Sequence, residues 1–169
     1  MSTTKPLEGI KVIEISTIIT ASLSAMMLSD QGAEVIKIEQ TGFGDPLRYL
    51  GTQKGGISAI FANTNRGKRS VELDLKIESD LAKAKKLISE ADVLINNFRP
   101  GVMDSLGLGK EDCKTLNKDL IYVAITGFGK EGPYANAPAY DHVVQAMSGS
   151  TAIQADEDKP KYIKTLFKV

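Results

Sequence analysis

The chain has 169 residues, enough for one domain with a sizeable hydrophobic core. Apolar residues make up 42% of the sequence and charged residues 25%, close to the averages for globular proteins, which argues against a disordered or fibrous protein. The 21 basic residues balance the 21 acidic ones, so no overall field attracts nucleic acid or an anionic membrane. We therefore expect neither as a partner, and any anion site should be a local cluster.

The sequence offers no disulfide and no recognisable metal site. Cys113 is the only cysteine, and no metal-ligand spacing surrounds it. The first residues lack the pattern of a signal peptide, and no apolar run approaches the length of a membrane span. We expect a cytoplasmic protein that needs no metal.

The first elements form a strand, helix, strand unit. Residues 9–15 are a short apolar run, residues 21–31 favour a helix with Gly32 as its C-cap, and residues 34–38 are the next strand. This is the size of a βαβ unit, so the two strands should be parallel with a right-handed crossover.

The alternation resumes after a long connection over residues 39–65, in which only residues 57–62 resemble a short helix. The expected strands are 70–73, 93–96 and 120–126, and the expected helices are 79–90 and 111–116. Strands alternating with helices predict an α/β fold, a three-layer Rossmann-like domain with a mainly parallel sheet.

Ligands of open α/β sheets bind at the carboxyl ends of the strands. In this chain the loops at those ends are residues 16–20, 39–45, 97–101 and 127–139. Functional residues are therefore expected in these four loops.

The loop that starts at Gly127 matches the glycine pattern of dinucleotide-binding proteins, with Gly129 and Gly132 at the right spacing. In that pattern a helix has begun by the third glycine, whereas Pro133 follows here, and the first strand runs into residues 16–20, which contain no glycine. Nicotinamide binding is the weaker interpretation.

A cluster of cations precedes the strand expected at residues 70–73. Arg66, Lys68 and Arg69 lie within four positions, and Lys76 follows the strand. Arginine and lysine in such a loop can pair with phosphates. The alternative is a solvated loop without a partner.

Residues 97–101 join a strand to a helix that should begin near Val102. Phe98 could stack on a ligand ring, or it could face the core beside a Pro-Gly turn.

Farther along the chain, Asp141 could serve as a nucleophile or base, but it more simply predicts the N-cap of a helix. His142 is expected at the surface.

The last eight residues, 162–169, are β-branched, aromatic and partly alternating, which predicts a strand. No turn residue closes it, so we expect the sheet to be incomplete at its C-terminal end.

Several segments in order together resemble the class III CoA-transferases, or CaiB/BaiF family, which includes formyl-CoA and carnitine CoA-transferases and the related α-methylacyl-CoA racemases. The segments are residues 6–14, 32–39, 44–45, 65–76, 91–101 and 126–134, with Tyr140, Asp141, Gln145 and Ala146. They cover nearly the whole chain.

The resemblance implies that residues 1–169 are the N-terminal, CoA-binding domain of such an enzyme, with coenzyme A or acyl-CoA as its substrate. The matching positions for CoA are Ile18, Gln40, Leu73, Asp74, Lys76, Asn97, Phe98, Val102 and Met103. The basic cluster would then lie near the CoA phosphates. Gln40 and Ser105 stand where the family often has arginine, which should weaken phosphate pairing or transfer it to Arg66, Lys68 or Lys76.

In the family an aspartate attacks the acyl-CoA thioester, and a carboxylic acid finally takes the CoA in a ping-pong exchange. The resemblance places that aspartate just after Val169, and Asp141, Asp156 and Asp158 do not match it. We therefore expect no catalytic nucleophile within these residues and no transferase activity from them alone.

The racemase branch has histidine at the position of Tyr140, so the transferase branch fits better, and Tyr140 could lie near the site. Family members are more than twice as long, with a second small domain, and form interlocked homodimers. A non-catalytic CoA-binding or assembly module is the remaining alternative.

Overall fold

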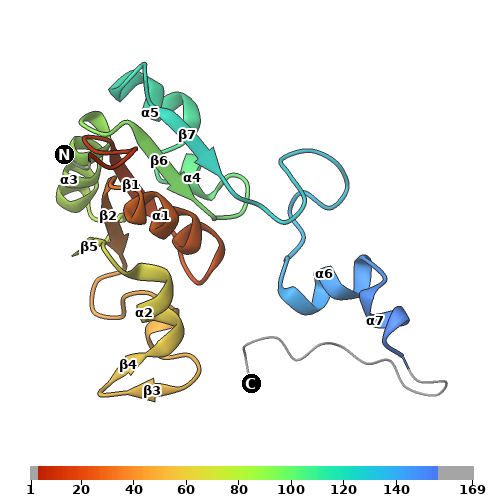
Figure 1. The fold of residues 1–169 in the computed structure, drawn as a ribbon. Coiled ribbons are helices and arrows are strands. Elements are labelled where there is room, and N and C mark those ends of the chain that lie inside the picture. The colour runs from red at the N-terminus through yellow and green to blue at the C-terminus, as the bar shows by residue number, and fades with distance from the viewer. Residues whose placement is uncertain (1–3, 156–169) are drawn as a thin grey trace. The chain divides into compact units, whose positions relative to one another are not determined.

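The computed structural model describes residues 4–155, which divide into two compact units between Ile125 and Thr126. The first unit is built on a five-stranded sheet (Figure 1). Its strands are β1 (Lys11–Ile15), β2 (Glu34–Glu39), β5 (Arg69–Glu72), β6 (Val93–Asn96) and β7 (Ile121–Ala124). The spatial order is β5-β2-β1-β6-β7, and every neighbouring pair is parallel. The predicted α/β fold with a mainly parallel sheet is confirmed.

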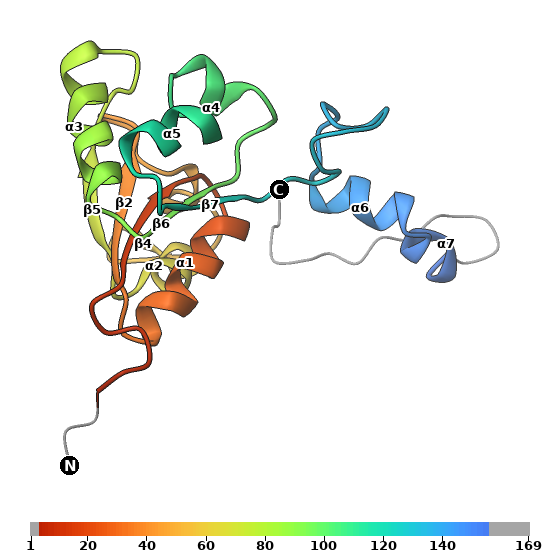
Figure 2. The ribbon, with the colours of Figure 1, turned by 90° about the horizontal axis from the view of Figure 1, so that it is seen from above.

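Helices cover both faces of this sheet (Figure 2). Helix α1 (Thr20–Asp30) covers one face, and α3 (Glu78–Ser89), α4 (Val102–Ser105) and α5 (Lys110–Leu116) cover the other. Because side chains alternate along a strand, neighbouring residues of a central strand pack in different cores. Val12 packs in the core under α1, whereas Ile13 packs in the core under α3.

The connection between β2 and β5 has more structure than its sequence predicts. It contains a short 3₁₀ helix η1 (Pro46–Arg48), a hairpin of β3 (Gln53–Lys54) and β4 (Ile57–Ser58), and helix α2 (Ala59–Asn65). The helix expected at residues 57–62 begins two residues later, because the Ser58 side chain accepts from the Phe61 N–H and caps it.

Two predicted cap positions are off by one residue. Gln31 is the C-cap of α1, and Gly32 follows it with φ +107°, a conformation that glycine tolerates best. Tyr140, not Asp141, is the N-cap of helix α6. Asp141 is the first helical residue, and its carboxylate accepts a hydrogen bond from Gln145.

The second unit, described to residue 155, contains α6 (Asp141–Met147) and α7 (Ser150–Ile153) after a long loop. Within the loop the rings of Phe128 and Tyr134 lie 5.7 Å apart. His142 is exposed, as expected. The strand predicted at residues 162–169 lies outside the described residues.

Across residues 4–155, none of the helices combines the length and the apolar character that crossing a membrane requires.

Candidate functional site

The carboxyl edge of the sheet brings the predicted loops together. From β1 the chain adds β2 and β5 on one side, and it then adds β6 and β7 on the other. The order therefore reverses between β1 and β6, which lie side by side in the middle of the sheet (Figure 1). Such a switch point opens a crevice between the two loops that leave these strands, and ligands of α/β sheets bind there.

Asn97 joins the two loops at this switch point. Its side-chain oxygen accepts from the Thr17 N–H at 3.1 Å, and its side-chain nitrogen donates to the Thr17 carbonyl at 2.7 Å. The same nitrogen donates to the Thr20 hydroxyl at 3.1 Å. One side chain after β6 therefore fixes the loop after β1 on both sides of Ile18.

Ile18 has φ +65° and is the only residue other than glycine with a positive φ among the residues that the structure describes. For a β-branched residue this left-handed conformation is a true outlier and costs on the order of 1–3 kcal/mol. Its backbone N–H donates to the Asp45 carboxylate at 3.0 Å. Strain of this kind concentrates at ligand sites, where the surrounding structure can hold it.

Beneath this loop lies a buried network of charges. Glu14 of β1 and Lys37 of β2 are in register, and both side chains extend toward Ser22 of α1. Lys37 Nζ lies 2.6 Å from Glu14 Oε1 and 2.9 Å from the Ser22 hydroxyl. Glu14 and Lys37 are 0% and 1% exposed, so the pair is fully removed from water.

Two further charges complete the network. Asp45 Oδ2 forms an ion pair with Lys37 Nζ at 2.9 Å, while its Oδ1 accepts from the Ile18 and Leu47 N–H groups. Lys68 Nζ donates to Glu14 Oε2 at 2.6 Å and to the Ser22 carbonyl at 2.8 Å. Two lysines thus balance two carboxylates, as burial of charge requires.

The pKa values follow from this balance. Burial acts to raise the pKa of Glu14, but the ammonium groups of Lys37 and Lys68 outweigh it and hold that pKa below its ordinary value. Burial lowers the pKa of Lys68, and its pairing with Glu14 offsets only part of that effect. Glu14 is therefore held as the carboxylate, which suits a structural anion rather than an acid catalyst.

A third buried carboxylate, Glu39, fixes the loop after β2. It accepts two hydrogen bonds from the Arg48 guanidinium, one from the Ser70 hydroxyl and one from the Asp45 N–H. Arg48 also stacks over the Phe61 ring at 3.9 Å. Although burial acts to raise it, these donors lower the pKa of Glu39 to about 2.

The remaining predicted positions lie around the same edge. Gln40 is exposed after β2, and the Leu73 N–H donates to the Glu39 carbonyl at 3.0 Å, which joins the ends of β5 and β2. Asp74 accepts from the Lys76 N–H at 3.0 Å in the turn before α3, and Lys76 is exposed. Gln40, Leu73, Asp74 and Lys76 thus follow neighbouring strands.

The positions after β6 divide into buried and exposed ones. Phe98 packs against the core cluster beneath α3, which favours its core-facing interpretation over ring stacking. Met103 is buried in α4, whereas Val102, the first residue of that helix, is 37% exposed. The Val102 side chain is therefore accessible to a ligand, whereas the Met103 side chain packs in the core. In the second unit Tyr140 is exposed, and its place in a site stays a prediction.

The basic cluster is not a solvated loop without partners, since three of its cations are paired. Lys68 is buried against Glu14, Arg66 pairs with Asp30, and Arg69 pairs with Glu34. Lys68, with 2% of its side chain exposed, has no access to a phosphate. Lys76 is exposed, and it is the cation of this set with no ion pair among the described contacts.

The glycine pattern of residues 127–132 lacks the geometry of a dinucleotide site. Gly129 and Gly132 adopt positive φ values of +81° and +95° within a series of turns, and α6 begins only at Asp141. No helix N-terminus therefore stands behind the third glycine to receive a pyrophosphate.

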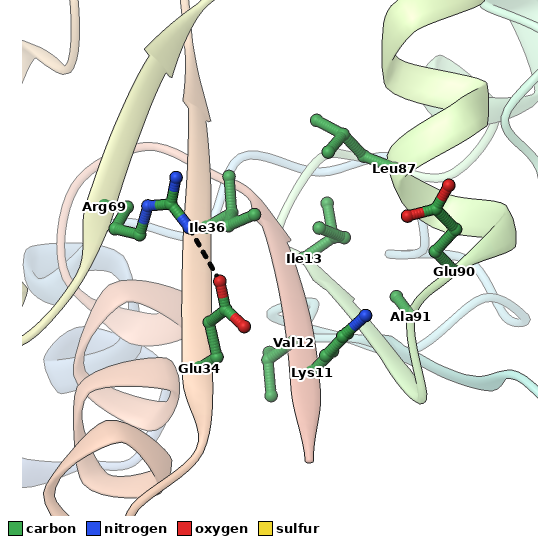
Figure 3. Close-up of a pocket in the computed structure, with 9 residues that line it drawn as sticks. All are labelled: Lys11, Val12, Ile13, Glu34, Ile36, Arg69, Leu87, Glu90 and Ala91. Atoms are coloured by element: carbon green, nitrogen blue, oxygen red, sulfur yellow. Dashed lines mark hydrogen bonds and ion pairs between the residues drawn. The ribbon is translucent and has the colours of Figure 1, made fainter. Parts of the chain in front are cut away.

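The opposite, amino edge of the sheet carries a cavity of about 250 Å³ (Figure 3). Its lining combines apolar side chains, among them Ile13, Ile36 and Leu87, with charged side chains that include Arg69, which is paired with Glu34. None of the predicted CoA-binding residues lines this cavity.

The charged network is what sequence reasoning missed. The residues that it overlooked as a group are Glu14, Lys37 and Asp45, and Lys68 was expected at a phosphate. A signal was present, because Glu14 and Lys37 are both the fourth residue of their strands. Opposite charges at matching positions of two parallel, buried strands predict an ion pair.

Comparison with known proteins gives the family. The family model described as CoA-transferase family III matches residues 7–167. The chain belongs to CoA-transferase family III. It is 44% identical over 155 residues to an acetyl-CoA:oxalate CoA-transferase of Acetobacter aceti and 41% identical over 160 residues to a succinate–glutarate CoA-transferase of Agrobacterium fabrum.

A solved CaiB/BaiF family structure from Brucella suis agrees in fold with this family III chain. It is 38% identical, has a TM-score of 0.88, and matches 97% of this chain and 45% of its own. The Acetobacter and Agrobacterium relatives align over 92% and 90% of this chain and 40% of their own length. The family III chain thus spans about two fifths of the curated relatives that it matches.

Proposed function

We propose that this chain forms the CoA-binding domain of an enzyme that exchanges CoA between an acyl-CoA and a carboxylic acid. Membership of CoA-transferase family III supports this class of reaction, as do relatives named for CoA exchange with oxalate and with glutarate.

The observation that carries the proposal is the junction at the switch point. Ile18 and Asn97, which the family resemblance assigns to CoA, lie on the two loops that leave the strands at this switch point, and Asn97 bonds to Thr17 and Thr20 on either side of Ile18. Gln40, Leu73, Asp74, Lys76 and Val102 are proposed to complete the cradle, with Phe98 and Met103 supporting it from the core. Of these, Lys76 offers a cation for phosphate.

Calorimetric titration of CoA into the chain tests this proposal. Asn97→Ala removes the bonds between the two loops, and because a loosened cradle must be ordered on binding, we expect the Kd for CoA to rise about tenfold or more. NAD serves as the competing ligand, and we expect it not to bind.

Asn117→Ala is the matched control. Asn117 also joins distant segments, because its side chain donates to the Ala91 carbonyl at 2.8 Å and accepts from the Asp119 N–H. It does so at the amino edge, before β7. We expect this variant to lose stability but to keep its Kd for CoA within about threefold. Equal losses of CoA affinity in the two variants, or no CoA binding by the wild type, would contradict the proposal.

A further inference from the structure

Besides the contacts that Asn97 makes with Thr17 and Thr20, the strained residue Ile18 has one hydrogen bond of its own. The Ile18 N–H donates to Asp45 Oδ1 at 3.0 Å, and no other described backbone or side-chain acceptor takes this N–H. Isoleucine disfavours φ +65° because its branched side chain crowds the backbone. Release of this hydrogen bond would therefore let the residue relax to a negative φ.

Asp45 is itself fixed from several sides. Its Oδ1 also accepts from the Leu47 N–H at 2.8 Å, and its own N–H donates to Glu39 at 2.9 Å. Lys37 Nζ lies 2.9 Å from its Oδ2, and the carboxylate is buried. The Asp45 carboxylate, which accepts from the Ile18 N–H, is therefore fixed in position and cannot move together with the loop.

Lys37 links Asp45 to the rest of the domain. Its ammonium group contacts Glu14 and Ser22, and Glu14 is held in turn by Lys68 from the segment before β5. This series of contacts connects the Ile18 N–H, through Asp45 and Lys37, to four parts of the domain. They are β1, β2, α1 and the segment between α2 and β5. Buried ion pairs often stabilise a protein no more than well-packed apolar side chains would. What these pairs do here is fix the position of the Asp45 carboxylate.

We propose that Asp45, fixed by Lys37, is a positioning residue that presets Ile18 in the left-handed conformation and so shapes the loop for CoA. This inference rests on the proposed function of the loop in CoA binding. It assigns roles to Asp45 and Lys37, neither of which is exposed enough to contact a ligand.

The test combines NMR of the labelled 169-residue chain with calorimetric titration of CoA. Three-bond couplings and carbon shifts report the φ of Ile18 without any ligand, and the titration gives the Kd. In Asp45→Ala we expect the positive-φ signature of Ile18 to disappear and the Kd for CoA to rise about tenfold, since only a fraction of molecules keeps the competent loop.

A double-mutant cycle separates this effect from a general loss of contacts. Glycine adopts positive φ at little cost, so in an Ile18→Gly background Asp45→Ala should raise the Kd by less than about threefold. Asp92→Ala is the matched control, because Asp92 also holds a backbone N–H, that of Lys11 at 2.8 Å, at the amino edge. It should leave both Ile18 and the Kd unchanged.

Each outcome decides the matter. A left-handed Ile18 that persists in Asp45→Ala, or an equal loss of affinity in the two backgrounds, would overturn the inference. Should Asp45→Ala fail to fold, Asp45→Asn keeps an acceptor oxygen but ends the ion pair with Lys37, and an unchanged Ile18 and Kd there would overturn it. No CoA binding by the wild type would defeat the proposed function and the ligand half of the inference, while the NMR measurement would still decide the backbone half.

Discussion

Two buried carboxylates at the carboxyl edge are held as anions by different kinds of partner. Glu14 lies between two lysines that are almost fully buried, whereas Glu39 binds Arg48, whose side chain is 37% exposed. Glu39 also accepts from Ser70 and from the Asp45 backbone. Because three kinds of donor act on it, Glu39 is the residue whose protonation should most clearly affect the stability of this edge.

We predict that Glu39 makes the domain sensitive to acid. Its pKa falls from 4.5 to about 2 on folding, so its contribution to the free energy of unfolding is complete above about pH 4.5 and is lost as the pH falls toward 2. In Glu39→Gln we expect a loss of roughly 1–2 kcal/mol near neutral pH, less than the full shift implies because solvent screens Arg48. Urea unfolding at a series of pH values measures it.

The difference between wild type and Glu39→Gln should shrink as the pH falls. Glu34→Gln is the control, because Glu34 pairs with Arg69 in a contact that is 45% and 74% exposed. Its cost should stay below about 0.5 kcal/mol. A Glu39→Gln difference that is constant from neutral pH to about pH 2 would refute the assignment.

For single residues, the sequence predicted which loops lie at the carboxyl edge, but it did not predict their backbone conformation or their ion pairs. Ile18 and Asn97 were placed at the carboxyl edge from the order of the strands and from the family resemblance. The positive φ of Ile18 could not be predicted, since nothing in an isoleucine suggests it, and Lys68 was indistinguishable from a solvent-facing cation until Glu14 was seen opposite it.

Among the elements, the turn from β2 into η1 connects the two buried charge clusters. Asp45 caps η1 by accepting from the Leu47 N–H, and Glu39 accepts from Asp45. Gly44 precedes Asp45 with φ +70°, where a Cβ atom would lie 3.0 Å from both Arg48 and Glu39. The turn therefore requires glycine for conformation and for space.

We predict that Gly44→Ala is markedly destabilising, whereas Gly42→Ala is milder. Both glycines have positive φ, +75° at Gly42, so both alanines bear a conformational cost of about 1 kcal/mol. Only Gly44→Ala also crowds Arg48 and Glu39, which must shift to admit the Cβ, because a Cβ at Gly42 meets nothing within 4 Å. The free energy of unfolding should differ between the variants by about 1–2 kcal/mol, and equal values would show that space at Gly44 is unimportant.

The regular elements of the sheet were predictable, and the connection between β2 and β5 was not. Apolar runs mark β1, β2 and β6 because their strands are buried on both faces. The two-residue strands β3 and β4 are too short to show any alternation of apolar and polar residues. Helix α2 begins later than predicted because Ser58 is its N-cap. Long connections carry weak local signals, since their conformation depends on tertiary contacts.

For the whole molecule, family membership and the loop geometry both support the proposed function, the binding of CoA. Relatives that carry the named activities are more than twice as long as this chain, which aligns with 40% of each. The described residues supply a switch point between β1 and β6, where Asn97 joins the two loops. The resemblance does not match Asp141, Asp156 or Asp158 to the family's nucleophile, so under the proposed function binding and chemistry should separate in this chain.

We predict that the purified 169-residue chain binds CoA but does not transfer it. Binding needs the loops around Ile18 and Asn97, whereas transfer needs a carboxylate to attack the thioester and form a covalent intermediate. Acetyl-CoA with oxalate and succinyl-CoA with glutarate, the pairs suggested by the relatives, should give no exchange of CoA by chromatography while calorimetry detects CoA binding. Exchange that Asp141→Asn abolishes would instead identify a nucleophile within these residues, and a chain that neither binds nor exchanges CoA would count against a CoA-binding domain.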